Sequence, residues 1–541
     1  MKITIKIQTT QRAIITYIKD KGKASVRVIS EAIGVPKSTV HNHLKRMRKR
    51  QKHPESHLWD TEEGAAWLRL LVLSTLYNFG LMGNNGADRL SLFFKQLKID
   101  THLGVSPNSL RILLRKMEKL LSDYQIICET EVTQRTNEPR HITAAADETF
   151  FGELMMLVMM DLSSGYILLE DIAEDRTFNT WWDKVKLRLS HTHIEIDHLI
   201  TDRAKALIKL ATNGAECESG ADLFHGQQTL SRGLGNPLKR RYIHVSKGLK
   251  KAWNKLSRLL KGSPYNPNID QQADEIIRLT REKQTLKCDK EIYNKTLKSI
   301  STDVHAFDID AQKQQCSQDV EAKLDEHADT LARIEKHHFP DKKTVSVFRK
   351  QNKALASCVD VWWHFVLSYL SPYKLLSSEE DWLLYFLLPT VYWHKQMMKT
   401  KDPWRRKRYK EAWESSLETW KLHPLTAMMH HHAIEEWQDW ALWMVDHFHR
   451  SSSAVEGRNG TLSQMYHARR GLTPARLKAL TVIFNYDHYR PDGKTPAEKL
   501  FKTSFPNLFE WMSDQMGVLP TPRQGKKRVF NKPLNLKAVP A

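Results

Sequence analysis

At 541 residues the chain is too long for one ordinary domain, and we expect three or four domains with packed cores because 41% of its residues are hydrophobic. Its 83 Lys and Arg residues outnumber its 62 Asp and Glu residues; the formal net charge of +21 favours a polyanion partner over a basic protein that has none. Five cysteines without a CxxC pair exclude a disulfide scaffold and a thiolate zinc site, and without a signal peptide or a membrane-length apolar run we expect a cytoplasmic protein with no membrane partner.

Residues 10–50 have the pattern of a helix-turn-helix unit, with helices over 11–19, 25–33 and 37–50 and a turn at Gly34. On the third helix, Val40, Leu44 and Met47 recur at helical spacing and form an apolar stripe. The remaining side chains are polar or basic, as a helix that enters a major groove requires; a small helical bundle with a solvated basic face is the alternative. The predicted DNA-binding residues are Lys37, Ser38, Thr39, His41, Asn42, Lys45 and Arg46.

A second copy of this pattern follows 70 residues later, where residues 103–117 align with residues 33–47. Gly104, the apolar stripe and two adjacent basic residues recur, so we expect tandem helix-turn-helix units that together read a longer DNA sequence. Helices over 67–79 and 87–97 are the expected scaffold of the second unit, and 130–140 is the expected polar linker to the next domain. Its predicted DNA-binding residues are Asn108, Arg111, Arg115 and Lys116.

The region from 141 to 211 predicts a β-β-β-α-β-α order. Strands are expected over 141–147, 153–160, 166–171 and 198–201, with a hairpin turn over 161–165 and helices over 177–189 and 203–211. Asp147 ends the first strand and Asp202 follows the fourth, so these carboxylates meet at one sheet edge if the two strands are neighbours. Two such carboxylates repel unless a cation such as Mg²⁺ lies between them; separately, each is an ordinary strand-end or N-cap residue.

A fifth strand is expected at 222–225, where a lone His225 is more often structural than catalytic. Residues 239–261 are densely basic and include the predicted DNA-binding residues Arg240 and Arg241; a phosphate-tracking surface and a solvated helix face remain equally open. Residues 269–336 predict a two-helix hairpin, with an extended coiled coil as the alternative. Trp-rich helices over 350–369, 379–398 and 404–420 predict a packed helical domain. Three consecutive histidines at 430–432 cannot all ligate one ion from a helix.

Residues 451–470 form the second key segment. A serine cluster is expected to cap a helix that carries Glu456 in its first turns, and the alternative is a solvated glutamate that favours the helix dipole. Gly457 and Gly460 weaken a helix, which indicates close approach of the sheet or of a nucleic-acid backbone. The predicted DNA-binding residues here are Arg458, Arg469 and Arg470. Gly471 is the expected C-cap, 472–486 the last helix of the core, 495–511 a helical tail and 523–537 a basic arm.

This layout resembles the DDE transposases of bacterial insertion sequences, whose ribonuclease-H-like core is split by an insertion. The resemblance implies an α/β ribonuclease-H-like core with mainly α-helical N-terminal helix-turn-helix domains and a large all-α insertion. It implies that Asp147, Asp202 and Glu456 are the catalytic residues and ligate two Mg²⁺ ions, for which Mn²⁺ can substitute. It also implies 3′-end cleavage and strand transfer, double-stranded DNA at the element ends and the target as partner, a homodimer or higher oligomer on DNA, and a nucleoid-associated location in the bacterial cytoplasm.

The expected domains are two helix-turn-helix domains (1–52 and 53–128), a first core part (129–238), the helical insertion (239–448), a second core part (449–490) and a C-terminal tail (491–541). The hairpin at 269–336 is the expected contact for a second subunit, because it has apolar residues that it cannot fully bury alone. Two other functions stay open: a catalytically silent, domesticated DNA-binding regulator, and a ribonuclease-H-like nuclease that cuts without joining.

Overall fold

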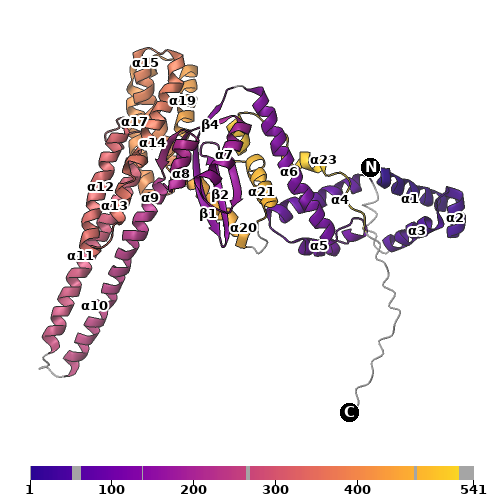
Figure 1. Cartoon of the computed structure of the whole chain (residues 1–541), viewed down its shortest axis with the longest axis horizontal. Helices are drawn as coiled ribbons and strands as arrows, with labels where there is room; N and C mark the ends of the chain where they lie inside the picture. Colours follow the sequence, from indigo (N-terminus) through magenta and orange to yellow (C-terminus); the bar gives the residue numbers. More distant parts are fainter. Residues whose placement is uncertain (1, 52–61, 137, 263–267, 468–471, 523–541) are drawn as a thin grey trace. The chain divides into compact units, whose positions relative to one another are not determined.

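The computed structural model describes residues 2–51, 62–136, 138–262, 268–467 and 472–522 (Figure 1). The chain divides into two compact units. The first unit comprises Met1–Cys128, Gln464–Glu498 and Thr503–Ala541, and the second unit comprises Glu129–Ser463 and Lys499–Lys502. Each is described by itself below.

The first unit begins with the expected helix-turn-helix fold, formed by α1 (Lys2–Lys21), α2 (Val26–Ile33) and α3 (Lys37–Gln51). The hydroxyl of Ser25 accepts a hydrogen bond from the amide of Val28 and caps α2. Gly34 ends α2 in the left-handed conformation with φ 64°, which glycine adopts without strain. Ile14, Ile29 and Val40, one from each helix, form the buried centre. The apolar stripe predicted on the third helix is therefore confirmed.

The second copy of the pattern does not reproduce this tight turn. Its helices are α4 (Glu62–Thr75), η2 (Leu76–Met82), α5 (Ala87–Gln96), η3 (Ile99–Thr101) and α6 (Pro107–Arg135). Whereas α2 and α3 are joined by residues 34–36, α5 and α6 are joined by residues 97–106. The amide of Gly104 donates to the carbonyl of Pro520 at 2.6 Å, and a Cβ on Gly104 would lie 2.7 Å from the carbonyl oxygen of Thr521. This glycine provides room for a C-terminal segment, and the expected second tight turn is wrong.

Helices from the C-terminal part of the chain complete the first unit: α21 (Pro474–Tyr486) and α23 (Leu508–Gln515). The guanidinium of Arg476 donates to the carbonyls of Gly80 and Leu81 at 3.0 and 2.8 Å, and Arg69 donates to the carbonyl of Ser513. Residues 472–486 were expected to be the last helix of the catalytic core. They belong instead to the first unit, because these polar contacts and the buried apolar face of α21 are satisfied there.

One helical stretch of the first unit, Glu62–Met82, is long and apolar enough to span a membrane by length and composition alone. Its side chains Leu68, Val72, Leu73 and Leu76 are almost completely buried within the protein. The stretch ends in the π-helix η2, and Arg476 donates hydrogen bonds to the carbonyls of Gly80 and Leu81 in it. Other large side chains of the stretch, namely Trp67, Leu70 and Phe79, are exposed.

The second unit contains the expected sheet, with strand order β3-β2-β1-β4-β5. The strands are β1 (Arg140–Phe151), β2 (Leu154–Asp161), β3 (Ile167–Ala173), β4 (Ile194–Thr201) and β5 (Glu218–Ala221). β2 pairs antiparallel with β1 and with β3, whereas β4 pairs parallel with β1 and with β5. β2 is buried on both faces, as its continuous apolar run predicted, and Thr177 caps α7 (Phe178–Thr192) as expected. This is the ribonuclease-H-like order.

Two local predictions around the sheet are corrected. The fifth strand is 218–221, and residues 222–225 instead begin α9 (Leu223–Leu230), because the carboxylate of Asp222 accepts the amide of Phe224 at 2.7 Å and caps that helix. Residues 130–135 are the end of α6 and not a linker. Just before them, Glu129 is fully buried and accepts two hydrogen bonds from the guanidinium of Arg188, at 2.9 and 2.7 Å.

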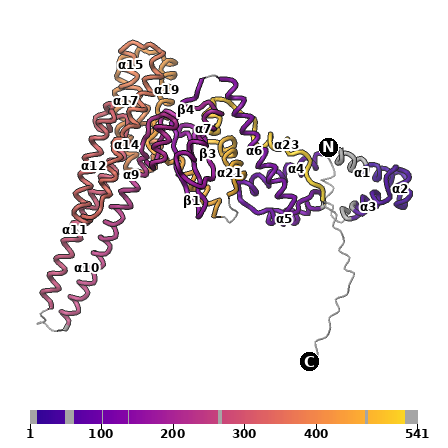
Figure 2. The backbone as a smooth tube through the Cα atoms, viewed as in Figure 1, coloured from indigo at the N-terminus to yellow at the C-terminus, as the bar shows by residue number. Residues whose placement is uncertain are grey.

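Beyond the sheet, the described residues from 236 to 446 are helical apart from turns and one isolated bridge. The long helices α10 (Asn236–Gly262) and α11 (Asn268–Asp303) pack side by side as an arm (Figures 1 and 2). The others are α12 (Ser317–His338), α13 (Thr344–Arg349), α14 (Asn352–Leu370), α15 (Ser377–Trp382), α16 (Leu388–Lys399), α17 (Pro403–Leu422), α18 (Pro424–Met428) and α19 (His431–Asp446).

The predicted hairpin over 269–336 is present, because α11 and α12 pack against each other, with His338 of α12 2.6 Å from Asp289 of α11. The sequence did not predict that α11 also packs against α10. Leu286, Ile300, Leu324 and Leu331 are completely buried in this one chain. Ile277 and Ile292 of α11 are exposed, so the contact with a second subunit stays a prediction.

The Trp-rich helices form the packed core that their composition predicted. His305 lies at its centre, completely buried, with Nδ1 2.6 Å from the hydroxyl of Tyr392 and Nε2 3.0 Å from that of Tyr409. Trp362, Trp393 and other aromatic side chains surround it. Burial lowers the pKa of His305 well below its usual value, so this histidine is a neutral structural residue.

Candidate active site

The two predicted aspartates lie at the same edge of the sheet. β1 and β4 are parallel neighbours in which Ala145 pairs with Ile200, and Asp147 and Asp202 each lie two residues further along. Because side chains alternate between faces with a period of two, both carboxylates project on the face of Ala145 and Ile200. The juxtaposition that the sequence predicted for Asp147 and Asp202 is thus present.

The backbone turns sharply directly after Asp202. A carboxylate oxygen of Asp202 accepts the amide of Ala204 at 2.9 Å, and Arg203 adopts φ 71°, a left-handed conformation that is unfavourable for a residue other than glycine. The guanidinium of Arg203 holds this turn by donating to the backbone carbonyl and the hydroxyl of Ser219 on β5, both at 2.9 Å. Asp202 therefore lies on a braced turn at the end of β4.

Helix α20 (Ser453–Met465) brings Glu456 to this edge. The side-chain amide of Asn459, one turn after Glu456, donates to a carboxylate oxygen of Asp147 at 3.0 Å. Just before the helix, the hydroxyl of Ser452 donates to the carboxylate of Asp222. These two contacts fix α20 against β1 and against the start of α9, with Glu456 between them.

The electrostatics of Asp147 connect the three acids. The pKa of Asp147 is raised from its ordinary value of 3.8 to about 6 as the net result of burial, which raises it most, of the nearby His225, which lowers it, and of the negative charges of Glu456 and Asp202, which raise it. Asp147 is 8% exposed, so water screens these interactions little. A nearby positive charge, such as that of His225 or of a bound cation, therefore favours the ionised form of Asp147.

His225 belongs to this site, which the sequence analysis did not predict. Its Nδ1 lies 2.7 Å from a carboxylate oxygen of Asp222, and its Nε2 lies 3.5 Å from Oε1 of Glu456. The hydrogen bond with Asp222 is the main cause that raises the pKa of His225, with further contributions from Asp147 and Glu456. The signal was present in the spacing: on a helix Asp222 and His225 share a face, whereas on the expected strand they do not.

Glu148, the neighbour of Asp147 on β1, is a further buried acid. It points to the other face, where the indole of Trp181 donates to it at 3.3 Å and the guanidinium of Arg176 lies 3.5 Å away. Burial raises the pKa of Glu148. These partners hold the side chain of Glu148, and the negative charge of Asp202 also raises its pKa.

The donor set suits a hard divalent cation such as Mg²⁺. Asp147, Asp202 and Glu456 offer carboxylate oxygens, and Oδ1 of Asn459 is buried without a partner among the described residues. The oxygen atoms of the three carboxylates do not all lie within 4.8 Å of one another. Among the described residues, ligand atoms that close together are found in Asp289, His337 and His338 of the helical region. A wider set is compatible with two ions, which lie ~3.5–4 Å apart in such centres.

The three consecutive histidines each have a separate contact. His430 caps α19 by accepting the amide of His432, and His431 and His432 face Glu435 and Glu436 at 3.2 and 3.4 Å. These are exposed pairs along one helix.

On α3, the first polar residues lie together. Lys37, Ser38, His41 and Asn42 line an open groove of about 360 Å³, with Val26 of α2 at its side. Lys45 is exposed and Thr39 is half-buried, while the side chain of Arg46 lies outside the described residues. A recognition helix that enters a major groove presents its N-terminal residues to the base edges in this way.

Comparison with known families decides what this part of the chain is. Residues 7–51 match a family described as winged helix-turn-helix DNA-binding, and residues 383–528 match a family of unknown function, DUF6399. The chain carries a DNA-binding domain. Neither description names a transposase, and no curated protein matches the chain. The DUF6399 match includes α20 with Glu456, whereas Asp147 and Asp202 lie outside it.

The remaining predicted DNA-binding residues separate into exposed and engaged side chains. Asn108, Arg115 and Arg240 are exposed. Arg111 pairs with Asp88 at 2.6 Å, Lys116 donates to the carbonyl of Met516 at 2.7 Å, and Arg241 pairs with Glu282 at 2.9 Å while donating to the carbonyl of His338. Arg469, Arg470, Gly471 and the arm at 523–537 lie outside the described residues.

Arg458 is a correction. It is 5% exposed and donates two hydrogen bonds to the buried carboxylate of Glu170 on β3, at 2.7 and 2.6 Å. An arginine held in such a bidentate pair within the core is a structural clamp between α20 and the sheet, and it is not available to DNA.

Gly457 and Gly460 lie on the exposed side of α20. A Cβ added to either glycine would meet nothing within 4 Å, so close approach of the sheet is not the reason for these glycines. Approach of a nucleic-acid backbone stays a prediction, since the open face directly adjoins Glu456.

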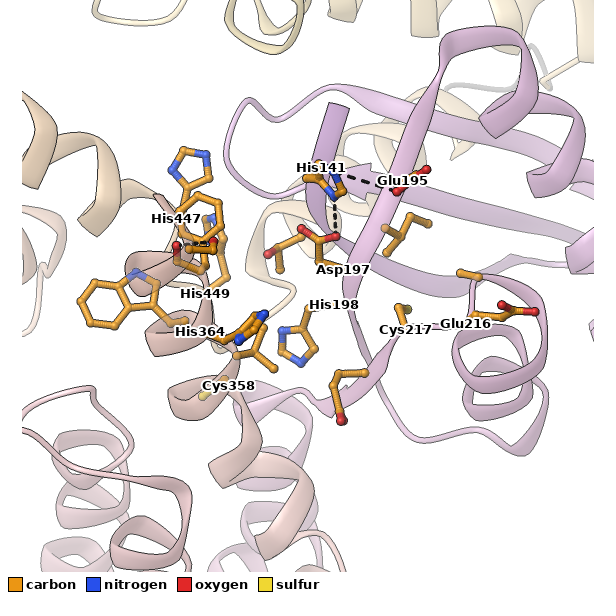
Figure 3. A pocket seen from close by; sticks show the side chains of 18 of the residues that line it. His141, Glu195, Asp197, His198, Glu216, Cys217, Cys358, His364, His447 and His449 are labelled. Atoms are coloured by element: carbon orange, nitrogen blue, oxygen red, sulfur yellow. Dashed lines mark hydrogen bonds and ion pairs between the residues drawn. The ribbon is translucent and has the colours of Figure 1, made fainter. Parts of the chain in front are cut away.

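A larger cavity of about 1550 Å³ lies at another part of the second unit, between β4 and α14 (Figure 3). His141, Asp197 and His198 from the sheet face Cys358 and His364 across it. His198 is 2% exposed, and burial lowers its pKa to about 4. Asp147, Asp202 and Glu456 do not line this cavity.

Proposed function

We propose that this protein is a DDE transposase that binds the ends of a mobile DNA element, cleaves their 3′ ends and joins them to target DNA. The observation that carries the proposal is the meeting of Asp147, Asp202 and Glu456 at one sheet edge, with the pKa of Asp147 raised by burial and by the other two charges. A chain with a DNA-binding helix-turn-helix domain and a net charge of +21 brings DNA to such an edge.

In this proposal Asp147, Asp202 and Glu456 hold the Mg²⁺ ions, which supply positive charge to the scissile phosphate and to the attacking oxygen. Asn459 orients Asp147 by its hydrogen bond, and Asp222 orients His225 beside Glu456. The first step is attack of water on phosphorus with departure of the 3′ oxygen. In the second step that 3′-hydroxyl attacks a target phosphodiester, and a strand of the target leaves. Each step exchanges one P–O bond for another and needs no oxidant or reductant.

Two functions remain alternatives. A silent DNA-binding regulator would use the helix-turn-helix domain alone, and a nuclease would cut without joining. The turn after Asp202 and the start of α20 lie at the same edge of the sheet, and both are held by hydrogen bonds. This favours the enzyme, because strained backbone beside a cluster of acids is typical of active sites.

The experiment begins with selection of bound sequences from random duplex DNA by the full-length protein. A labelled duplex that contains the selected sequence is then incubated with protein in Mg²⁺ or EDTA, and cleaved and joined products are separated by electrophoresis. We expect Mg²⁺-dependent cleavage and joining, and a loss of both by at least about a hundredfold in Asp202→Asn with binding retained. The control is Glu195→Gln, which removes the charge of an exposed side chain on β4.

Each outcome has a distinct meaning. Binding without cleavage in the wild-type protein supports the regulator, and cleavage without joined product supports the nuclease. Cleavage by Asp202→Asn at the wild-type rate contradicts the assignment of the site.

A further inference from the structure

Helix α10 has an unusual charge composition. Across its 27 residues it has nine Lys or Arg residues and neither Asp nor Glu. The structure shows which of these cations are already used: Arg241 pairs with Glu282 of α11 and donates to the carbonyl of His338. The question is where the other basic side chains point.

The packing of the arm answers this. Apolar residues of α10 recur alternately four and three positions apart and are buried or half-buried against α11, as in an antiparallel coiled coil. They are Leu238, Tyr242, Val245, Leu249, Ala252 and Leu256. The facing residues of α11 follow the same spacing, with Ile276, Leu279, Leu286, Tyr293 and Ile300 buried. This seam fixes the rotation of α10 about its axis.

With the seam turned inward, the basic side chains lie along the outer face. Arg240, Lys247, Lys251, Arg258 and Lys261 are exposed. At 1.5 Å per residue, Arg240 and Arg258 are about 27 Å apart along the helix. A row of cations of this length is as long as about eight base pairs of duplex DNA, which carries one phosphate per ~3.4 Å on each strand.

The neighbouring helix gives the contrast. On α11, Arg278 pairs with Glu275 at 2.7 Å and lies 3.5 Å from Glu282, so that helix neutralises its own surface. On α10, Lys247, Lys251 and Lys255 follow one another at i, i+4 spacing, where like charges repel. A polyanion laid along α10 relieves this repulsion, whereas solvent alone only screens it.

We propose that the outer face of α10 is a sequence-independent contact for the phosphate backbone of duplex DNA. The proposal rests on the proposed function only in taking DNA as the partner, which the helix-turn-helix match also supports. It extends that function, because the helical region would then bind DNA outside the sequence that the helix-turn-helix domain recognises. Arg240 belongs to this contact, and Arg241 does not.

The test compares two triple variants of the full-length protein. Lys247→Gln, Lys251→Gln and Arg258→Gln remove charge from α10, and Arg281→Gln, Lys287→Gln and Lys295→Gln remove the same charge from exposed positions of α11. Affinity for the selected duplex and for a random duplex is measured in EDTA over a range of salt concentrations, with circular dichroism to verify folding. Because no cleavage is needed, the result is independent of the catalytic proposal.

We expect the α10 variant to lower the slope of log affinity against log salt by about 2 to 3, since each lost phosphate contact removes ~0.9. Its preference for the selected over the random duplex should stay unchanged, and the α11 variant should keep the wild-type slope. An unchanged slope in the α10 variant, or an equal loss in both variants, overturns the proposal. Equal competition by double-stranded RNA overturns the choice of DNA as the partner.

Discussion

Nε2 of His225 lies 3.5 Å from Oε1 of Glu456, and Nδ1 of the same ring lies 2.7 Å from Asp222. The carboxylate of Asp222 also accepts the hydroxyl of Ser452, which is 230 residues further along the chain. One buried carboxylate thus connects the end of the sheet with the beginning of α20. The position of Glu456 depends on this connection as much as on its own helix.

The first prediction concerns His225. His225→Ala removes the group that orients Glu456, and we expect cleavage of the selected duplex to slow by about ten- to a hundredfold, as is usual for a partner of a metal ligand. DNA affinity in EDTA should not change, since His225 lies outside both the helix-turn-helix domain and the outer face of α10. His431→Ala, at an exposed histidine on α19, is the control. Wild-type cleavage by His225→Ala would show that the ring does not position Glu456.

Asp147 predicts a pH dependence of stability for the metal-free protein. Its pKa in the fold is about 6, above the ordinary 3.8, so the folded chain holds the proton more tightly than the unfolded chain. The contribution of Asp147 to stability therefore falls as pH rises from about 4 to about 6, by up to about 3 kcal/mol, and is constant above that window.

Thermal unfolding of wild type and Asp147→Asn in EDTA measures this contribution, because other titrating groups cancel in the difference. We expect the variant to gain stability relative to wild type across that window. Addition of Mg²⁺ at neutral pH should raise the unfolding temperature of wild type more than that of the variant. A difference that does not change with pH contradicts the buried environment of Asp147.

Arg458 predicts a stability effect without a DNA effect. Arg458→Met leaves the carboxylate of Glu170 buried and unpaired, which costs about 3–5 kcal/mol. Arg458→Met combined with Glu170→Leu should recover most of this loss. Arg176→Met, which removes an exposed partner of Glu148, should cost at most about 1 kcal/mol. Denaturant unfolding measures all three, and a single Arg458→Met variant that is as stable as wild type would refute the clamp.

The groove on α3 predicts a loss of sequence preference. Asn42→Ala should lower the preference for the selected over the random duplex by about 5- to 150-fold, corresponding to ~1–3 kcal/mol for one base contact. Lys19→Ala, at an exposed position of α1, is the control. A point variant is preferable to deletion of residues 1–120, because deletion would strip α21 of the helices that bury it. Retained preference in Asn42→Ala would remove this residue from the recognition surface.

A substitution at Gly460 distinguishes an effect on helix stability from an effect on cleavage. Because an added Cβ meets nothing within 4 Å, Gly460→Ala should stabilise the helix by up to about 1 kcal/mol. If a DNA backbone approaches this face, the same variant should cleave more slowly despite its greater stability. Gly248→Ala on α10, where the added methyl makes only ordinary contacts, should stabilise without slowing cleavage. Unchanged cleavage by Gly460→Ala would contradict the approach of DNA at this point.

The sheet and its two aspartates could be predicted because their signals are local. β2 is a continuous apolar run, Thr177 is a good N-cap, and a short strand precedes Asp202. Because β1 and β4 are neighbours in the sheet, Asp147 lies beside Asp202. The helix-turn-helix domain was equally visible, since Gly34 and the stripe at Val40 lie within a few residues of each other.

The remainder depended on contacts between distant residues. Arg458 reads as a surface cation, and only the fold brings Glu170, 288 residues earlier, against it. The apolar seam of α10 is masked in the sequence by nine basic residues, so the pairing with α11 was missed. The pattern at Gly104 copies that at Gly34, but a segment near Pro520 occupies the space beside it.

The first unit is assembled from the beginning of the chain and from two stretches beyond residue 463. On the ribosome, α4, η2 and α6 emerge long before α21, so residues 136–463 must be synthesised before Arg476 can bond the carbonyls of Gly80 and Leu81. During this delay Tyr77 and Tyr124 lack their aromatic partners Phe509 and Trp511. A translation product that stops early therefore carries exposed apolar surface, which marks it for chaperones and proteases before it can act on DNA.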